Sequence, residues 1–214
     1  AIKEYTELGS GFKIAMRDLE IRGAGNLLGA EQHGHMEAIG YDLYCKMLND
    51  AVKRMKGDIV EEEFETSIDL PVDAYIPASY VKNEFQKLEL YKRISNIANE
   101  EEYEDLMDEI VDRYGELPKS VVLLLQVALL KAKAHDNFIA AIEKKGVYIH
   151  FTMAPCAKVK VEQIEEFLKK NRPNMKLLRG EQPGFQYEVT KIPKKDLLNC
   201  VQSVINDVSD LIER

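Results

Sequence analysis

Glycine and polar residues alternate between residues 22 and 34, in the run RGAGNLLGAEQHG. Glycine lets a backbone take positive φ or approach another backbone closely, so this spacing predicts an extended loop. Within the loop, Arg22 offers a planar guanidinium that suits phosphate or carboxylate groups. Gln32 carries both donor and acceptor groups on one side-chain amide. The pattern therefore predicts a loop that presents Arg22 and Gln32 to a partner.

Several kinds of reactive site are not supported by the motifs. No G-x-x-x-x-G-K-[ST] run occurs, so the chain lacks the loop that cradles nucleotide phosphates. The glycines of the loop also miss the dinucleotide-binding spacing. His33 and His35 form no common zinc spacing with Cys45. We therefore predict no metal, no cofactor and no catalytic residue in this chain.

The surrounding sequence carries a family resemblance. The run DLEIRGAGNLLGAEQHGHMEAIGYDLYCKML, residues 18–48, resembles the translocation motif shared by transcription-repair coupling factors and RecG-type branch-migration helicases. Two later runs, YKRIS at residues 91–95 and DRYGELP at residues 112–118, resemble the C-terminal module of the coupling factors. The likeness covers almost the whole chain, and its first motif is the most specific.

The resemblance implies a larger parent protein, an ATP-driven translocase on double-stranded DNA. Its motor domains would lie upstream of this chain, bind ATP and Mg²⁺, and carry out the hydrolysis. The glycine-rich loop would couple hydrolysis to DNA movement through Arg22 and Gln32, with Arg17 as a weaker candidate. Alternatively, Arg22 only forms an ion pair with Asp18 or Glu20 and stiffens the loop.

The same resemblance implies a regulatory role for the C-terminal part. In the family this part is expected to dock on a distant N-terminal module and mask it. That module recruits the excision-repair protein UvrA, and the parent also engages stalled RNA polymerase. The acidic face of one predicted helix, which also includes Glu104, is the expected docking surface. Its proposed docking residues are Glu101, Glu102, Asp105, Asp108 and Glu109. They would suit a basic partner surface, whereas a merely solvated helix face is the alternative.

Composition describes a globular chain with an uneven charge distribution. The 214 residues are 45% apolar and 31% charged, and they contain no apolar run long enough to span a membrane. Three scattered cysteines, Cys45, Cys156 and Cys200, favour reduced thiols in a cytoplasmic protein. The net charge is −8, which argues against a general nucleic-acid-binding surface.

Acidic and basic residues separate along the chain. Residues 61–120 hold 17 acidic and 6 basic residues, a balance of −11. Residues 141–200 hold 7 acidic and 12 basic residues, a balance of +5. Two faces of opposite charge favour a protein partner selected by charge complementarity.

Apolar periodicity, together with the positions of glycine, proline and acidic residues, predicts that the chain has three parts. Residues 1–57 would form a helix end, the glycine-rich loop and a helix, as the arm of a helical hairpin; residues 58–67 would be an acidic linker. Residues 68–214 would form an α+β domain of helices packed on a small, mostly antiparallel sheet. The expected helices cover 79–97, with Ser79 as cap, 101–114, 119–135, 161–170 and 194–212. Val81 and Phe85 are expected in the buried stripe of the first helix and Val111 inside the second, and the third should be the central helix because it is apolar nearly all round. The expected strands cover 138–142, 147–151, 175–178 and 185–190, with a turn at 143–146 and an edge segment at 68–76.

Two other functions remain open on this evidence. The chain could be a free-standing acidic interaction module with no motor, which the sequence preceding Ala1 would decide. It could also be a hydrolase that uses the His33–His35 region, for which an ATPase assay on the chain is expected to be blank. The glycine-rich motif favours the translocase segment over both.

Overall fold

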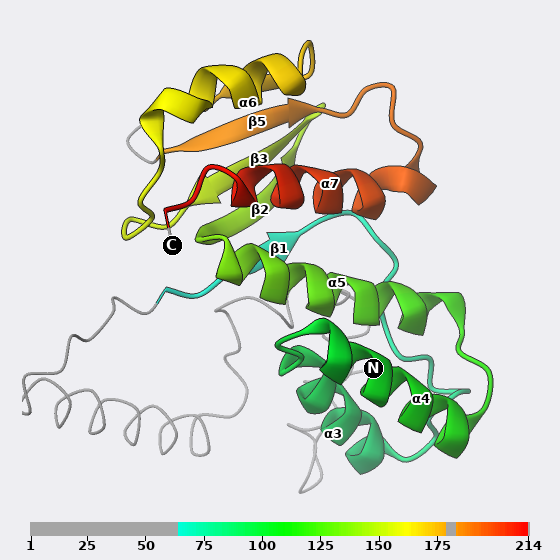
Figure 1. Cartoon of the computed structure of the whole chain (residues 1–214). Coiled ribbons are helices and arrows are strands. Elements are labelled where there is room, and N and C mark those ends of the chain that lie inside the picture. Colours follow the sequence, from blue (N-terminus) through cyan, green and yellow to red (C-terminus); the bar gives the residue numbers. More distant parts are fainter. Residues whose placement is uncertain (1–63, 179–182, 214) are drawn as a thin grey trace, which may run out of the picture.

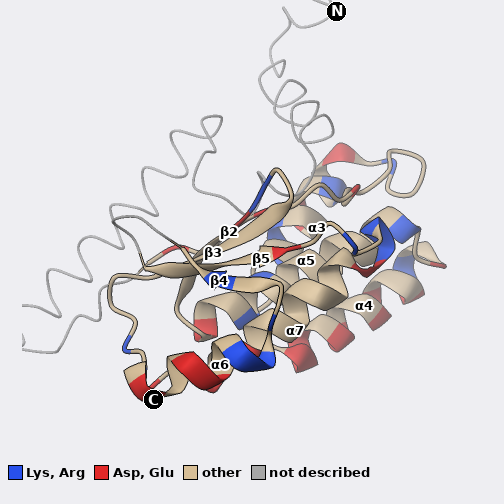
Figure 2. Cartoon of the chain, turned by 90° about the horizontal axis from the view of Figure 1, so that it is seen from above, with Lys and Arg blue, Asp and Glu red and all other residues tan. Residues whose placement is uncertain are grey.

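The computed structural model describes residues 64–178 and 183–213, which form two layers. One layer is a five-stranded sheet in the order β1-β2-β3-β5-β4, and the other consists of helices on one face of that sheet, two of which pack on a central helix beyond it (Figures 1 and 2). This confirms the predicted α+β class. The predicted helical arm and loop, residues 1–57, and the linker up to residue 63 lie outside the described residues.

The sheet is mixed but mainly antiparallel, as predicted. Its antiparallel strands are β2 (Ile139–Lys145), β3 (Tyr148–Met153), β5 (Gly184–Glu188) and β4 (Met175–Leu177). The short strand β1 (Ser67–Asp69) pairs in parallel with β2 and forms one edge. The turn predicted at Glu143–Gly146 is wrong, because Glu143 pairs with His150 and Lys145 with Tyr148. The connection shrinks to residues 146–147, where Gly146 has φ of 61°.

Helix α3 (Glu84–Ser95) starts later than predicted. Its N-cap is Asn83, whose side-chain oxygen accepts hydrogen bonds from the backbone N–H groups of Phe85 and Gln86. The predicted cap, Ser79, lies instead in a turn in which the N–H groups of residues 80 and 81 donate to the Pro77 carbonyl. Val81 is buried as expected, but in this turn and not in the helix.

The later start of α3 changes which side chains are buried. Leu90, Tyr91 and Ile94 face the core, and Lys87 occupies the remaining position of that stripe with only 3% of its surface exposed. Phe85, which the sequence placed in the stripe, is 76% exposed. Two residues along a helix turn the side chain by about 200°, so Phe85 and Lys87 must face opposite sides.

The next two helices follow the predicted pattern closely. Helix α4 (Glu100–Tyr114) ends at Gly115, whose φ of 83° favours glycine. Only Val111 departs from its predicted interior position, since it is 43% exposed. Helix α5 (Lys119–Asp136) is apolar on most sides and contacts α3 and α4 as well as strands β1 and β2. It is therefore the central helix of the domain, as predicted (Figure 1).

Two further helices complete the helical layer. Helix α6 (Ile164–Lys170) places Phe167 against Phe185 of β5, with 4.7 Å between the ring centroids. Helix α7 (Leu197–Ser209) packs on α5, and 3-10 turns at Val161–Gln163 and Lys194–Asp196 precede the two helices. Among residues 64–178 and 183–213, no helix combines the length and apolarity that crossing a membrane requires.

Gly184 is required by a close approach between β5 and β3. A Cβ atom added at Gly184 would lie 2.3 Å from the backbone oxygen of Phe151, a distance that only a backbone shift could relieve. We expect Gly184→Ala to lower the free energy of unfolding by about 1–3 kcal/mol, because the two strands would be forced apart.

Chemical denaturation of the 214-residue chain measures this effect. The control is Gln186→Ala, two residues along the same strand, which is expected to cost under about 0.5 kcal/mol. Equal effects from the two substitutions would show that the strands tolerate the added methyl group.

Candidate docking surface on helix α4

The structure describes only part of the predicted functional set. Arg22, Gln32 and Arg17 lie outside the described residues, so their coupling role stays a prediction. The carboxylates predicted on one helix all lie on α4. They fall into two groups, those bonded within the domain and those without a bonded partner among the described residues.

The first turn of α4 holds its carboxylates in local bonds. The Asn99 side chain accepts a hydrogen bond from the Glu102 N–H at 2.9 Å, and the Glu102 carboxylate accepts one from the Ala98 N–H at 2.9 Å. This reciprocal arrangement caps the helix in the manner of a capping box. Glu100 forms an ion pair with Lys133 of α5 at 2.9 Å. Glu102, although predicted as a docking residue, therefore already serves the helix end.

Glu109 joins helices α3 and α4. Its two carboxylate oxygens accept hydrogen bonds from both terminal nitrogens of Arg93, at 2.6 and 2.5 Å, and Arg113 adds a third bond at 3.1 Å. The hydrogen bonds from Arg93 are the main reason that the pKa of Glu109 falls from 4.5 to about 2. The same pairing raises the pKa of Arg93. Glu109 therefore acts within the domain, as an interhelical contact.

The remaining carboxylates of α4 form a single outward-facing row. Their spacing is i, i+3, i+4, i+7 and i+11, which keeps them on one side of the helix, opposite buried Leu106 and Ile110. All are exposed, and within residues 64–178 and 183–213 none has a hydrogen bond or ion pair; Figure 2 colours the acidic positions of α4 red. We call this set the acidic row: Glu101, Glu104, Asp105, Asp108 and Asp112.

The acidic row differs from the predicted set in membership. Glu101, Asp105 and Asp108 were predicted as docking residues and Glu104 as a neighbour on the same acidic face, whereas Asp112 was not predicted. Asp112 follows Asp108 by four residues, and residues with this spacing share one side of a helix, so the sequence could have predicted it. Glu102 and Glu109 are not in the acidic row, because their carboxylates already accept hydrogen bonds within the domain. Glu102 accepts one in the helix cap, and Glu109 accepts from Arg93 and Arg113.

No cluster of metal-ligating side chains accompanies the acidic row. Throughout the part of the chain that the structure describes, no group of three or more His, Cys, Asp and Glu residues is placed to hold a metal ion. Val111 lies beside the row on α4 and is 43% exposed, which adds an apolar element to the surface. A row of like charge can attract an oppositely charged protein surface, and Val111 offers an apolar contact beside it.

Known proteins share both the sequence and the fold of this domain. The profile described as the TRCF domain matches residues 70–164. A crystal structure of the C-terminal domain of transcription-repair coupling factor superposes with a TM-score of 0.62 at 22% identity, covering 71% of this chain and 96% of that one. The described region is thus a two-layer α+β domain of the TRCF type.

Curated relatives extend the match over the whole chain. The transcription-repair-coupling factor of Bacillus subtilis is 48% identical over 163 residues, which are 76% of this chain and 14% of the relative. Those of Staphylococcus epidermidis and Borreliella burgdorferi are 37% and 39% identical over 98% and 96% of this chain, and 18% of each relative. The chain belongs to the transcription-repair-coupling factor family and spans less than a fifth of these relatives.

The Glu109 bonds predict a pH-dependent contribution to stability. Because the folded-state pKa of about 2 lies below the ordinary value of 4.5, the stabilisation is complete above pH 4.5 and is lost as pH falls towards 2. Glu109 is 39% exposed, so we expect Glu109→Gln to cost only about 1 kcal/mol at pH 7.

Urea denaturation of both proteins at pH 7 and at pH 2.5 measures the difference. The loss of unfolding free energy caused by Glu109→Gln is expected to be smaller at pH 2.5 than at pH 7. Asp108→Asn, in the acidic row, should cause no such loss at pH 7. An equal loss of unfolding free energy at both pH values would contradict the stabilising role of the ionised Glu109 carboxylate.

Proposed function

We propose that this chain is a segment of an ATP-dependent double-stranded DNA translocase that releases stalled RNA polymerase and recruits excision repair. In this proposal the ATP and Mg²⁺ sites belong to motor domains outside the chain, and the parent acts in the bacterial cytoplasm. The domain at residues 64–213 is autoinhibitory: it docks on the module that binds UvrA and masks it. The acidic row of α4 is the observation that carries the docking part.

The electrostatics of the acidic row support docking. Like charges three or four residues apart on a helix repel, by about 0.2–0.5 kcal/mol for each pair. The row contains several such pairs, including Glu101 with Asp105 and Glu104 with Asp108, and none of its carboxylates forms an ion pair with a described cation. A basic protein surface would relieve this repulsion and gain attraction, so complementary charge is the favoured partner chemistry.

The loop supports the motor part of the proposal through its sequence alone. The matches to two relatives cover 96–98% of this chain and so extend across the glycine-rich run, and each relative is a transcription-repair-coupling factor. We propose that Arg22 and Gln32, with a lesser part for Arg17, couple ATP hydrolysis to movement along double-stranded DNA.

The alternative is a free-standing acidic interaction module without a motor. It uses the same acidic row and therefore predicts the same basic partner. The two proposals differ in the loop, which has no function in the alternative. Family membership and the length of the relatives, more than five times that of the chain, favour the translocase segment.

Charge reversal on the acidic row tests the docking. In the full-length protein, the triple substitution Glu101→Lys, Asp105→Lys and Asp108→Lys should release the masked module, because a basic surface would then repel α4. We expect at least tenfold tighter binding of UvrA than in the wild type, measured by titration at fixed ionic strength.

The control reverses three exposed carboxylates elsewhere in the domain, Glu116, Glu162 and Glu166, which changes the net charge equally. UvrA affinity should then stay within twofold of the wild type. Equal affinities for wild type and the α4 variant would remove the acidic row from the docking surface.

Substitution of the loop arginine tests the coupling. In the full-length protein, Arg22→Ala should leave ATP binding intact and reduce DNA translocation and polymerase release at least tenfold, because the guanidinium contact is lost. Lys13→Ala, which removes a nearby cation outside the glycine-rich run, is the control. Translocation by Arg22→Ala at the normal rate would refute the coupling role.

A further inference from the structure

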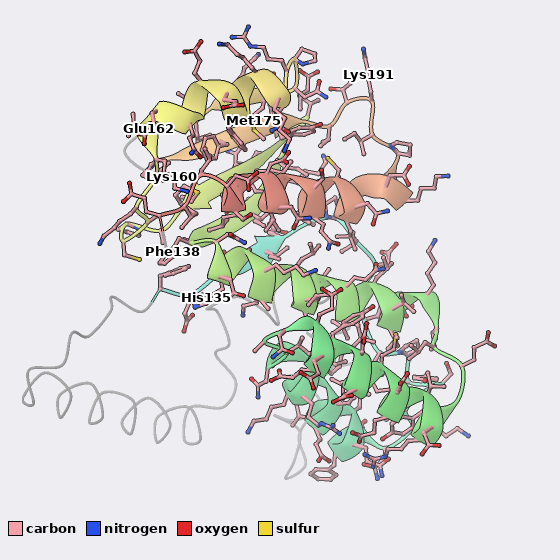
Figure 3. All side chains as sticks on the ribbon, in the orientation of Figure 1. His135, Phe138, Lys160, Glu162, Met175 and Lys191 are labelled. Atoms are coloured by element: carbon pink, nitrogen blue, oxygen red, sulfur yellow. The ribbon has the colours of Figure 1, made fainter. Side chains whose placement is uncertain are left out.

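The first described residues cross the domain as a short strap. We define the strap as residues 64–69, which include β1 and enter beside the C-terminal end of α5, near His135 and Phe138 (Figures 1 and 3). The sequence placed residues 64–67 in a linker, yet their side chains contact α5 and the start of β2. These contacts have no role in the docking or coupling proposed above.

An aromatic stack holds the beginning of the strap. The ring of Phe64 stacks on His135, with centroids 4.5 Å apart and planes inclined by 25°, and also on Phe138 at 6.0 Å. Phe138 has φ of 55°, in the left-handed region that a residue after a helix end usually fills with glycine. A bulky side chain in this conformation is strained, so its stacking with Phe64 offsets part of that cost.

A buried hydroxyl holds the middle of the strap. Thr66 is 2% exposed, and its Oγ1 donates a hydrogen bond to the Ile139 carbonyl at 2.8 Å. Because a hydroxyl has one proton, its 3.3 Å contact with Nδ1 of His135 must run the other way, with Nδ1–H as donor. Thr66 therefore joins the last turn of α5 to the first residue of β2.

The end of the strap is held by the sheet and the core. Ile68 is 1% exposed and lies in the parallel pairing of β1 with β2, which spans only three residues at the sheet edge. The strap's contacts thus join it to α5 and β2. Removing it would leave the β2-β3-β5-β4 part of the sheet and its helices still packed against one another.

We propose that the strap is a clasp, a unit that opens and recloses while the rest of the domain stays folded. When closed, it fixes the point at which the preceding chain leaves the domain, beside the end of α5. When open, it adds six residues to that preceding chain, a gain in reach of up to about 20 Å. This inference does not depend on the acidic row or on the loop.

Hydrogen exchange on the 214-residue chain tests the clasp. In the wild type, the amides of Ser67–Asp69 should exchange at least tenfold faster than those of α5 and β3, because they open without global unfolding. Thr66→Val should speed the strap amides about tenfold more, since it removes the buried hydroxyl bonds while keeping the side-chain shape. Exchange in α3, α4 and α7 should change less than twofold.

The matched control is Thr190→Val, which removes an exposed hydroxyl that donates to Glu188, and it should change neither region. Phe64→Leu is the second variant, because it removes the aromatic stack while retaining apolar bulk, and it should speed the strap amides alone. Three results would overturn the clasp: uniform acceleration across the domain, no acceleration of the strap, or failure of both variants to fold.

Discussion

The domain depends on the burial of α5 from several sides. Its side chains Val121, Leu124, Leu125 and Ala134 are almost wholly buried, so neighbouring elements must cover different faces of the same helix. The sheet and α7 lie on one side of it, and α3 and α4 lie on another. Because one helix supplies contacts in all these directions, the other elements need only one apolar face each.

This division explains why charge can gather on α4. Leu106 and Ile110 are buried, and Tyr103, Met107 and Tyr114 of α4 also pack against the core, which leaves the outer side of the helix free of any packing requirement. Of the carboxylates on the helix, Glu100 forms an ion pair with Lys133 of α5, Glu102 contributes to the cap, and Glu109 contributes to the contact with α3. The others repel one another and contribute nothing to the fold that the described contacts reveal, so their role should be sought in a partner.

The sequence predicted the elements that depend on local signals and missed the features that depend on tertiary packing. Helices α4 and α5 were predicted to within one residue, because their apolar periodicity and the stop at Gly115 are local signals. The start of α3 was missed, since Ser79 and Asn83 are both good caps and only tertiary packing selects between them. The bond between Glu109 and Arg93 was equally invisible, because it requires the relative placement of two helices.

The strap shows why composition alone is a weak guide to domain boundaries. The average composition of residues 58–67 is that of a solvated linker, because the stretch contains Glu61, Glu62, Glu63 and Glu65. Phe64, Thr66 and Ile68 alternate with the polar residues, and each lies against α5 or β2. Alternation with a period of two is the mark of a strand that buries one face. Glu65 and Asp69, the exposed acidic residues of the strap, keep the outer side of this ordered segment solvated, and the boundary of the domain follows the apolar residues instead.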